Sequence, residues 1–257
     1  MTNPVTRTAA NRNGWQLRNL VPGAAVAALV IAGTALALLL GPLASSAAED
    51  AVEIPAPAAD VPLAKAHGSE TIVLAGGCFW GVQKVFQHVR GVERAVSGYA
   101  GGDANTADYE TVSTGRTGHA ESVQITFDPS VVSLGTLLRV YFSVAHNPTQ
   151  LNYQGPDHGT QYRSEIFTTH DEQKRVAAAY IHQLDEAHVF RAPIVTRIEP
   201  LQHFYAAEGY HQDYATLHPD SGYIAHFDLP KVRNLEQLFP QLYRTAPVLV
   251  AVASAGR

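Results

Sequence analysis

Beyond residue 70, short apolar runs alternate with segments whose apolar residues recur at helical spacing. Residues 72–75 (IVLA) are continuously apolar, which is typical of a strand covered on both faces. In residues 79–89, phenylalanines and valines recur at the spacing of a helix with one apolar side. Residues 92–99 predict a second strand. The sequence therefore predicts a β-α-β unit whose helix follows two glycines at 76–77.

The domain continues this alternation to about residue 198. We expect strands at residues 122–127, 162–168 and 193–198. Helices are expected at residues 134–145 and from residue 169 to about residue 190. Loops are expected at residues 101–108 and 148–159. The 169–172 run (THDE) has the spacing of a capping box. Beyond residue 198 we expect irregular structure with short helices. This order predicts an α/β fold, a two-layer sandwich with a mixed sheet of ferredoxin-like type and an irregular C-terminal region.

Both ends of the chain lie outside this alternation. Three arginines precede an apolar run at residues 24–40, and small residues (ASSAA) follow at 44–48. Residues 1–48 are therefore expected to be a signal peptide, with retention as an N-terminal membrane anchor as the alternative. Either way we expect an exported domain, periplasmic or membrane-anchored outside the cytoplasm, because the positive flank stays inside. We expect an extended Ala/Pro-rich linker at 49–69, the folded domain at 70–244 and a frayed tail at 245–257.

The composition excludes some partners. Hydrophobic residues make up 46% and charged residues 16% of the chain, which is typical of a globular protein. The formal net charge is −5, and we find no basic stripe interleaved with aromatic residues. Nucleic acid is therefore not an expected partner, because its phosphates need a positive surface. We expect a monomer.

The chain has one cysteine, Cys78, so it can form no internal disulfide or cysteine-rich metal site. Cys78 opens the first predicted helix, where N–H groups and the helix dipole favour a thiolate and should lower its pKa below ~8.5. The alternative is a small buried apolar residue. Phe79 and Trp80 follow it and could form an apolar pocket suited to a methyl group, or pack in the core.

A carboxyl and two phenols are the other candidates for chemistry. Glu121 shares a strand face with apolar residues at 123, 125 and 127, so we expect it to be buried with a raised pKa, as a general acid requires. The alternative is a carboxylate that reaches solvent at the strand end. Tyr109 and Tyr162 lie beside polar loop residues, where a phenol can donate to a developing oxyanion. Packing is the alternative role for both.

The 12 histidines do not predict a metal site. His203, His211 and His218 lie near one another in sequence, but without an HExxH motif or tight ligand spacing. A thiol hydrolase remains a rival function, with Cys78 as nucleophile and His119 or His211 as base. The second rival is a non-catalytic binding domain that uses the aromatic residues.

Four motifs follow one another along the domain: residues 77–81 (GCFWG), 117–121 (TGHAE), 157–164 (DHGTQYRS) and 207–214 (AEGYHQDY). In sequence and in order they resemble the motifs of the A-type peptide-methionine sulfoxide reductases. The resemblance covers roughly residues 70–243 and implies the fold and activity of that family. Four ordered motifs are far more specific than one.

The resemblance also implies residue roles. Cys78 would attack the sulfoxide sulfur and become a sulfenic acid, and Glu121 would protonate the departing oxygen. Tyr109 and Tyr162 would hydrogen-bond that oxygen. A final set binds the substrate: Phe79 and Trp80 would hold its methyl group, and Asp157 would position the methionine main chain.

The chain departs from many relatives because it has no resolving cysteine near the C-terminus. An external thiol must then reduce the sulfenic acid. We expect no bound cofactor and a reductant such as thioredoxin, glutaredoxin with glutathione, or dithiothreitol. The partners expected from the resemblance are proteins or peptides with oxidised methionine, and a thiol protein or small thiol.

Overall fold

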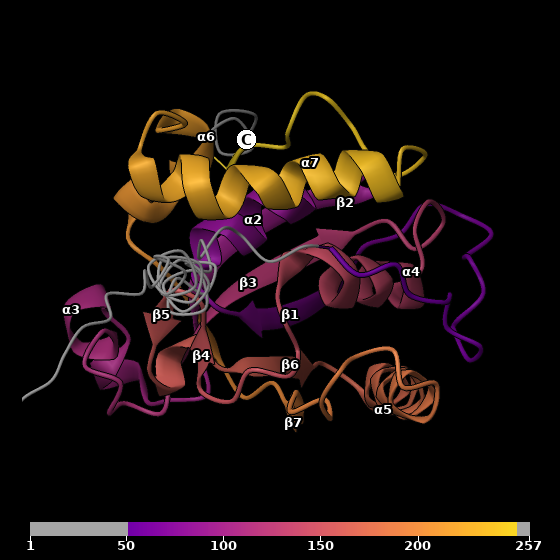
Figure 1. The fold of residues 1–257 in the computed structure, drawn as a ribbon, viewed down its shortest axis with the longest axis horizontal. Helices are drawn as coiled ribbons and strands as arrows, with labels where there is room; N and C mark the ends of the chain where they lie inside the picture. Colours follow the sequence, from indigo (N-terminus) through magenta and orange to yellow (C-terminus); the bar gives the residue numbers. More distant parts are fainter. Residues whose placement is uncertain (1–50, 251–257) are drawn as a thin grey trace, which may run out of the picture. The chain divides into compact units, whose positions relative to one another are not determined.

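Six strands form one mixed sheet in the order β7-β6-β1-β3-β2-β8, within residues 51–250, the part that the computed structural model describes (Figure 1). The sheet strands are β1 (Glu70–Gly76), β2 (Val92–Ala100), β3 (Ala120–Phe127), β6 (Ser164–Thr168), β7 (Arg197–Pro200) and β8 (Phe204–Ala206). Neighbours are antiparallel, except for the parallel pair β6 and β7. Strands β1 and β2 therefore run the same way with β3 between them, a split β-α-β arrangement. The predicted mixed α/β sandwich is confirmed.

In the described part of the chain, the helices contribute to the main core on one face of this sheet, and none contributes to the smaller cluster on the other face. A second small sheet joins β4 (Tyr153–Gln154) to β5 (Asp157–His158). The helices are α2 (Phe79–Gln87), α3 (Tyr109–Val112), α4 (Leu134–Val140), α5 (Asp171–Glu186), α6 (Tyr214–Leu217) and α7 (Leu229–Leu238). Helix α2 lies against the sheet, and α7 packs on the outside of α2 (Figure 1). In residues 51–250, no helix combines the length and apolar character that a membrane span requires.

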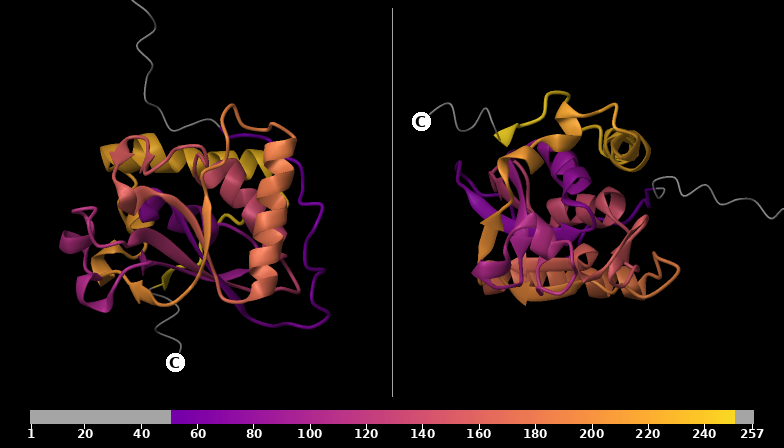
Figure 2. Two further views of the ribbon diagram at one scale, coloured as in Figure 1. Left: turned by 90° about the horizontal axis from the view of Figure 1, so that it is seen from below. Right: turned by 90° about the vertical axis from the view of Figure 1, so that its left-hand side faces the viewer.

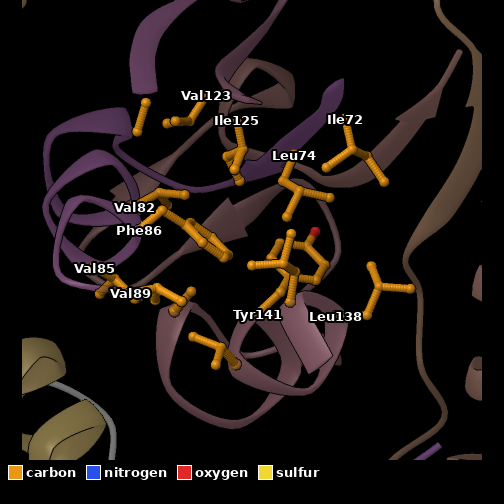
Figure 3. Packing of buried hydrophobic residues seen from close by; sticks show 14 of the residues in the cluster. Ile72, Leu74, Val82, Val85, Phe86, Val89, Val123, Ile125, Leu138 and Tyr141 are labelled. Atoms are coloured by element: carbon orange, nitrogen blue, oxygen red, sulfur yellow. The ribbon is translucent and has the colours of Figure 1, made fainter. Parts of the chain in front are cut away.

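The alternation along β1 divides the interior into two clusters. Ile72 and Leu74 point into the main core with the apolar side of α2, as Figure 3 shows. Val73 and Ala75 point to the other face and belong to a smaller cluster. Successive side chains of a strand face opposite ways, so a continuously apolar strand is what this position requires.

Residues 51–69, here called the N-terminal strap, run along α4 and α5 (Figure 2). Ile54 is only 1% exposed and belongs to the main core. The Tyr180 hydroxyl donates a 2.6 Å hydrogen bond to the Pro55 carbonyl. Asp60 accepts from the N–H of Gly135 at 2.8 Å, so its carboxylate sits at the N-terminus of α4, where the helix dipole favours it. The strap is thus a packed part of the fold, where the sequence suggested a linker.

The chain also stays packed beyond residue 244. The N–H of Val248 donates to the Gln87 carbonyl at 3.1 Å, and the N–H of Val250 donates to the Asp213 carboxylate at 3.1 Å. These bonds tie residues 245–250 to the fold, where a frayed tail was expected. The expected signal or anchor at 1–48 and the tail end at 251–257 lie outside the described residues.

The structure differs from the sequence prediction in four details. Helix α5 is capped by His170 without a side-chain bond, and Glu172 pairs with Arg175, so there is no capping box. Gln173 instead accepts from the N–H of Thr169 at 2.9 Å. The helix ends at Glu186, and β7 lies at Arg197–Pro200 rather than 193–198. The short strands β4, β5 and β8 were not predicted, because two or three residues carry no periodic pattern.

Candidate active site

Cys78 lies at the junction between β1 and α2, where it is the N-cap residue of the helix. Gly77 precedes it with a φ of +88°, a conformation that L side chains rarely adopt. A Cβ at Gly77 would lie 2.6 Å from Cβ of Gln154, so the Gln154 side chain packs directly against this glycine. These features hold the cysteine in a tight turn, with 9% of its surface exposed.

The protonation of Cys78 differs from the sequence prediction. Burial raises the pKa of its thiol well above the usual value, and the charges of Glu121 and Asp228 raise it further. The hydrogen bond from the Trp80 backbone acts in the opposite direction and is the smaller effect. The prediction of a lowered pKa is therefore wrong for the substrate-free protein, because desolvation and neighbouring carboxyls outweigh the helix N-terminus.

Glu121 is placed beside this junction by the register of the sheet. It lies on β3 opposite Tyr99 of β2, with 3% of its surface exposed. The backbone N–H of Phe79 donates a 3.0 Å hydrogen bond to Glu121 Oε2. Burial raises the pKa of the carboxyl to about 8, although the bond from Phe79 lowers it. The predicted burial of Glu121 and the predicted increase in its pKa are both confirmed.

The two aromatic residues after Cys78 have different surroundings. Phe79 is 1% exposed and belongs to the main core. Trp80 is partly exposed and stacks on Tyr214, with ring centroids 4.0 Å apart. Its indole N–H donates to Nδ1 of His211 at 3.2 Å. Trp80 therefore presents a fixed aromatic face beside the sulfur, whereas Phe79 contributes mainly to packing.

Both candidate phenols lie around Cys78 and Glu121. Tyr109 begins α3, and its N–H donates to Glu208 at 2.9 Å. Tyr162 ends a 3-10 turn before β6. Burial raises the pKa of both hydroxyls, and the charges of Glu121 and Cys78 raise it further. Both phenols therefore remain protonated and able to donate at neutral pH.

Asp157 lies on β5, in the wall of a cavity that reaches Cys78. The Tyr223 hydroxyl donates a short hydrogen bond to Asp157 Oδ2. Burial raises the pKa of Asp157, and this bond and the charge of Lys231 act against the increase. The structure thus brings together all seven residues singled out from the sequence.

Sequence reasoning missed the residues that support this group. Glu208 accepts from the Tyr99 hydroxyl at 3.0 Å and from the N–H of Tyr109, which fixes α3 to the sheet. Tyr223 holds Asp157, and Asp228 is fully buried near Cys78. The 207–214 motif contained the signal for Glu208, but no pattern in the sequence marks Tyr223 or Asp228.

The histidines near the site do not serve Cys78 as bases. His211 accepts from the Trp80 indole, and burial lowers its pKa. His119 Nε2 lies 3.0 Å from the Asp103 carbonyl. His146 lines the cavity, but burial lowers its pKa to about 3 and both ring nitrogens bond to Tyr141 and Ser164. This arrangement disfavours a hydrolase, which needs a basic histidine beside the sulfur.

Within residues 51–250, one group of side chains has the spacing of a metal site. His67, Glu93 and Asp128 bring ligand atoms within 4.8 Å of one another. His67 Nδ1 already contacts Asp128 Oδ2 at 2.7 Å, and this hydrogen bond explains the grouping without a cation.

The fold and the site define a thiol-dependent oxidoreductase of the α/β class, because a lone cysteine meets a buried acid rather than a base. A sequence model described as peptide methionine sulfoxide reductase matches residues 70–242. The chain therefore belongs to this family and is an oxidoreductase that reduces methionine sulfoxide.

Individual relatives agree. A Mesorhizobium japonicum protein named peptide methionine sulfoxide reductase MsrA 2 is 67% identical over 74% of this chain and 97% of its own length. A protein of the same name from Synechocystis is 50% identical over 72% of this chain and 88% of its own. The crystal structure of reduced Mxr1 from Saccharomyces cerevisiae matches with a TM-score of 0.54 and 34% identity, over 62% of this chain and 93% of that one.

Proposed function

We propose that the protein reduces methionine (S)-sulfoxide in proteins and peptides through a sulfenic acid at Cys78. The observation that carries this proposal is the buried carboxyl of Glu121, bonded at 3.0 Å to the N–H of Phe79, the residue next to Cys78. Its pKa of about 8 keeps it protonated at neutral pH. A proton donor beside a thiol is what reduction of a sulfoxide requires, because the oxygen must leave carbon-bound sulfur as a hydroxyl.

In the first step, Cys78 Sγ attacks the sulfoxide sulfur while Glu121 supplies a proton to the oxygen. The oxygen moves to Cys78, so methionine leaves reduced and the cysteine becomes a sulfenic acid. The thiol proton restores Glu121, and the step balances without a cofactor. Ionisation of Cys78 is coupled to proton uptake by the oxygen, since its free thiol pKa is raised.

The surrounding residues orient the substrate. The Tyr109 and Tyr162 hydroxyls donate to the sulfoxide oxygen, on which negative charge develops. The aromatic face of Trp80 holds the methyl group on sulfur, with the buried Phe79 ring packed behind it in the core. Asp157, fixed by Tyr223, accepts from the main-chain N–H of the methionine.

An external thiol recycles the enzyme. The chain has no second cysteine, so the sulfenic acid condenses with one thiol and a second thiol releases a disulfide. A small thiol or a thiol protein such as thioredoxin or glutaredoxin supplies these electrons.

Incubation with a peptide containing racemic methionine sulfoxide and dithiothreitol tests the proposal. We expect the (S) epimer alone to be consumed, by chiral analysis of the remaining sulfoxide, and Cys78→Ser to abolish the reaction. If neither epimer is consumed, the proposed function is rejected. If both are consumed equally, the proposed stereochemistry is rejected. Comparing free methionine sulfoxide with the peptide then defines the substrate preference.

We also propose export, on the basis of the arginines, apolar run and small residues in the first 48 positions. Cell fractionation with N-terminal sequencing of the mature protein tests this, and separates a cleaved leader from a retained anchor. Light scattering tests the expected monomer.

A further inference from the structure

A cavity of about 530 Å³ reaches Cys78 and extends the substrate site. Its wall includes Asp157 and Tyr223, the pair proposed to hold the methionine main chain, and also Lys231 of α7. Asp157 can accept a hydrogen bond from the main-chain N–H of the substrate, but the carbonyl or carboxylate of the same residue still lacks a partner. Lys231 presents the opposite charge in the same cavity wall.

The position of Lys231 runs against the preference of its own helix. The residue lies in the first turn of α7, where the helix dipole disfavours a cation. Asp228 is the N-cap residue of this helix, yet its side chain makes no capping hydrogen bond. Its Oδ1 instead lies 3.5 Å from Lys231 Nζ, and the carboxylate is fully buried. The two side chains therefore serve a purpose other than stabilising the start of α7.

Gly81 allows this pair to approach the helix that begins after Cys78. Helix α7 packs on α2, and Gly81 lies in the first turn of α2, three positions after the cysteine (Figure 1). A Cβ at Gly81 would overlap the carboxylate of Asp228 and lie 3.1 Å from Lys231 Nζ. The ammonium is therefore held close to the turn that carries the sulfur.

The ammonium of Lys231 also has donors to spare. It has three N–H groups, and Asp228 is its only ionic partner among residues 51–250. Burial raises the pKa of Asp228 to about 6, so this carboxyl is ionised at neutral pH and can hold the lysine in place. The lysine side chain is 18% exposed, so its charge lies in the cavity wall rather than extending into solvent.

We propose that Lys231 binds the α-carboxylate of free or C-terminal methionine sulfoxide, and the peptide carbonyl of an internal one, opposite Asp157. This inference rests on the proposed function, since it names a substrate group that the same site binds. Asp228 is a positioning residue, because it contacts Lys231 and not the substrate. A carboxylate makes a charge-assisted hydrogen bond with an ammonium, which is stronger than the bond of a neutral carbonyl. Lys231 should therefore contribute more to binding of a substrate that ends in a carboxylate.

The test compares N-acetyl-methionine sulfoxide, which carries a carboxylate, with its neutral N-methyl amide, using the full chain and saturating dithiothreitol. Lys231→Met removes the cation, and Lys231→Arg keeps it. Arg233→Met is the matched control, because Arg233 is exposed on the same helix and does not line the cavity. Arg191→Met tests the rival cation, because Arg191 also lines this wall.

We expect Lys231→Met to raise KM for the carboxylate about tenfold relative to KM for the amide, the size of one charge-assisted hydrogen bond. The change should fall on KM rather than kcat, because this contact is the same before and during the reaction. Lys231→Arg should restore most of the ratio. Arg233→Met and Arg191→Met should leave the ratio at the wild-type value.

A double variant controls for the charge that Lys231→Met leaves behind. Asp228 would then be buried without its partner, and its charge could repel the substrate carboxylate or disturb the fold. Asp228→Asn combined with Lys231→Met removes both charges, and the KM ratio should still rise. A rise in the single variant that is absent from the double variant would assign the effect to Asp228 and overturn the inference. If Lys231→Met does not fold, the ratio in the double variant decides.

The remaining outcomes separate the two proposals. An unchanged ratio in Lys231→Met, or an equal rise in Arg191→Met, would reject the carboxylate site at Lys231 and leave the reductase function intact. If the wild type reduces neither substrate, the proposed function itself is rejected.

Discussion

The backbone N–H of Phe79 donates a 3.0 Å hydrogen bond to Glu121 Oε2, which joins the catalytic strand β3 to the first turn of α2. An N–H group only donates, so the carboxyl proton is best carried by the other oxygen, Oε1. Burial keeps that proton in place, with a pKa of about 8 for Glu121. The bond therefore orients the Glu121 carboxyl at the turn that carries Cys78. The same buried position on β3 also raises the pKa of this carboxyl.

The first prediction concerns pH. A general acid must be protonated, so kcat/KM should be sustained below the Glu121 pKa of about 8 and fall as pH rises through it. In Glu121→Gln the amide cannot deliver a proton, so the rate should fall by about 10²–10⁴ and the decline above pH 8 should disappear. Steady-state rates with a peptide sulfoxide across pH 6–10 (an interval of about ±2 around the expected value) measure both effects.

Glu93→Gln is the matched control, because Glu93 is exposed and is not one of the residues assigned to the reaction. It should leave the pH profile unchanged. A Glu121→Gln enzyme with normal turnover at neutral pH would remove Glu121 from the mechanism.

The second prediction concerns the reactivity of Cys78. The burial and neighbouring carboxyls that raise its pKa should make alkylation by iodoacetamide slow at neutral pH. Asp228→Asn removes a negative charge that raises this pKa, so it should speed alkylation at neutral pH. Glu121→Gln should speed alkylation only above pH 8, where the Glu121 carboxyl with its pKa of about 8 is ionised in the wild type. Since the chain has one cysteine, the mass increase of the intact protein reports on Cys78 alone. A titration midpoint below ~8.5 in the wild type would show that the helix N-terminus dominates after all.

Glu121 and Cys78 show which properties of the site the sequence predicts and which it does not. The face shared by Glu121 with three apolar positions is a local property of one strand, so burial and a raised pKa followed directly. The Cys78 prediction placed the residue correctly at the start of α2 but gave the wrong direction for its pKa. That error arose because burial, the largest cause of the raised thiol pKa, comes from tertiary packing, as do the charges of Glu121 and Asp228. Asp228 lies 150 residues later in the numbering, and no local pattern brings it near.

The same limit applies to the fold. The order of long elements was predictable because their periodicity is local, whereas the position of β3 between β1 and β2 depends on long-range pairing. The N-terminal strap was missed for a related reason. Its Ala and Pro residues resemble a linker, but single side chains such as Ile54 and Asp60 reach the core and the start of α4.

The third prediction concerns the phenols. Tyr109 and Tyr162 approach Glu121 from different elements, so Tyr109→Phe and Tyr162→Phe should each slow reduction by removing one donor to the oxygen. Each should lower the rate constant of the reduction step by up to about 10²–10³, the usual effect of losing one preorganised oxyanion donor, and the double variant should lower it further. Single-turnover reduction of the peptide without thiol isolates this step from recycling. Tyr153→Phe is the control, because Tyr153 stacks on His158, outside the site. A double variant with normal single-turnover rates would assign both rings to packing.

The last prediction concerns Ile54 in the N-terminal strap, a residue that should stabilise the domain without taking part in catalysis. Ile54 is 1% exposed, so Ile54→Ala should leave a cavity in the main core and lower the free energy of unfolding by about 2–5 kcal/mol. For a domain of this size, that corresponds to a fall in Tm of roughly 5–15 °C. Leu63→Ala is the matched control in the same segment, because Leu63 is 53% exposed, and its Tm should stay close to that of the wild type. Below the transition, the thiol-free single-turnover rate should be unchanged in both variants, because neither residue lines the site. If Ile54→Ala and Leu63→Ala lowered Tm equally, the strap would not be anchored in the core as the buried position of Ile54 requires.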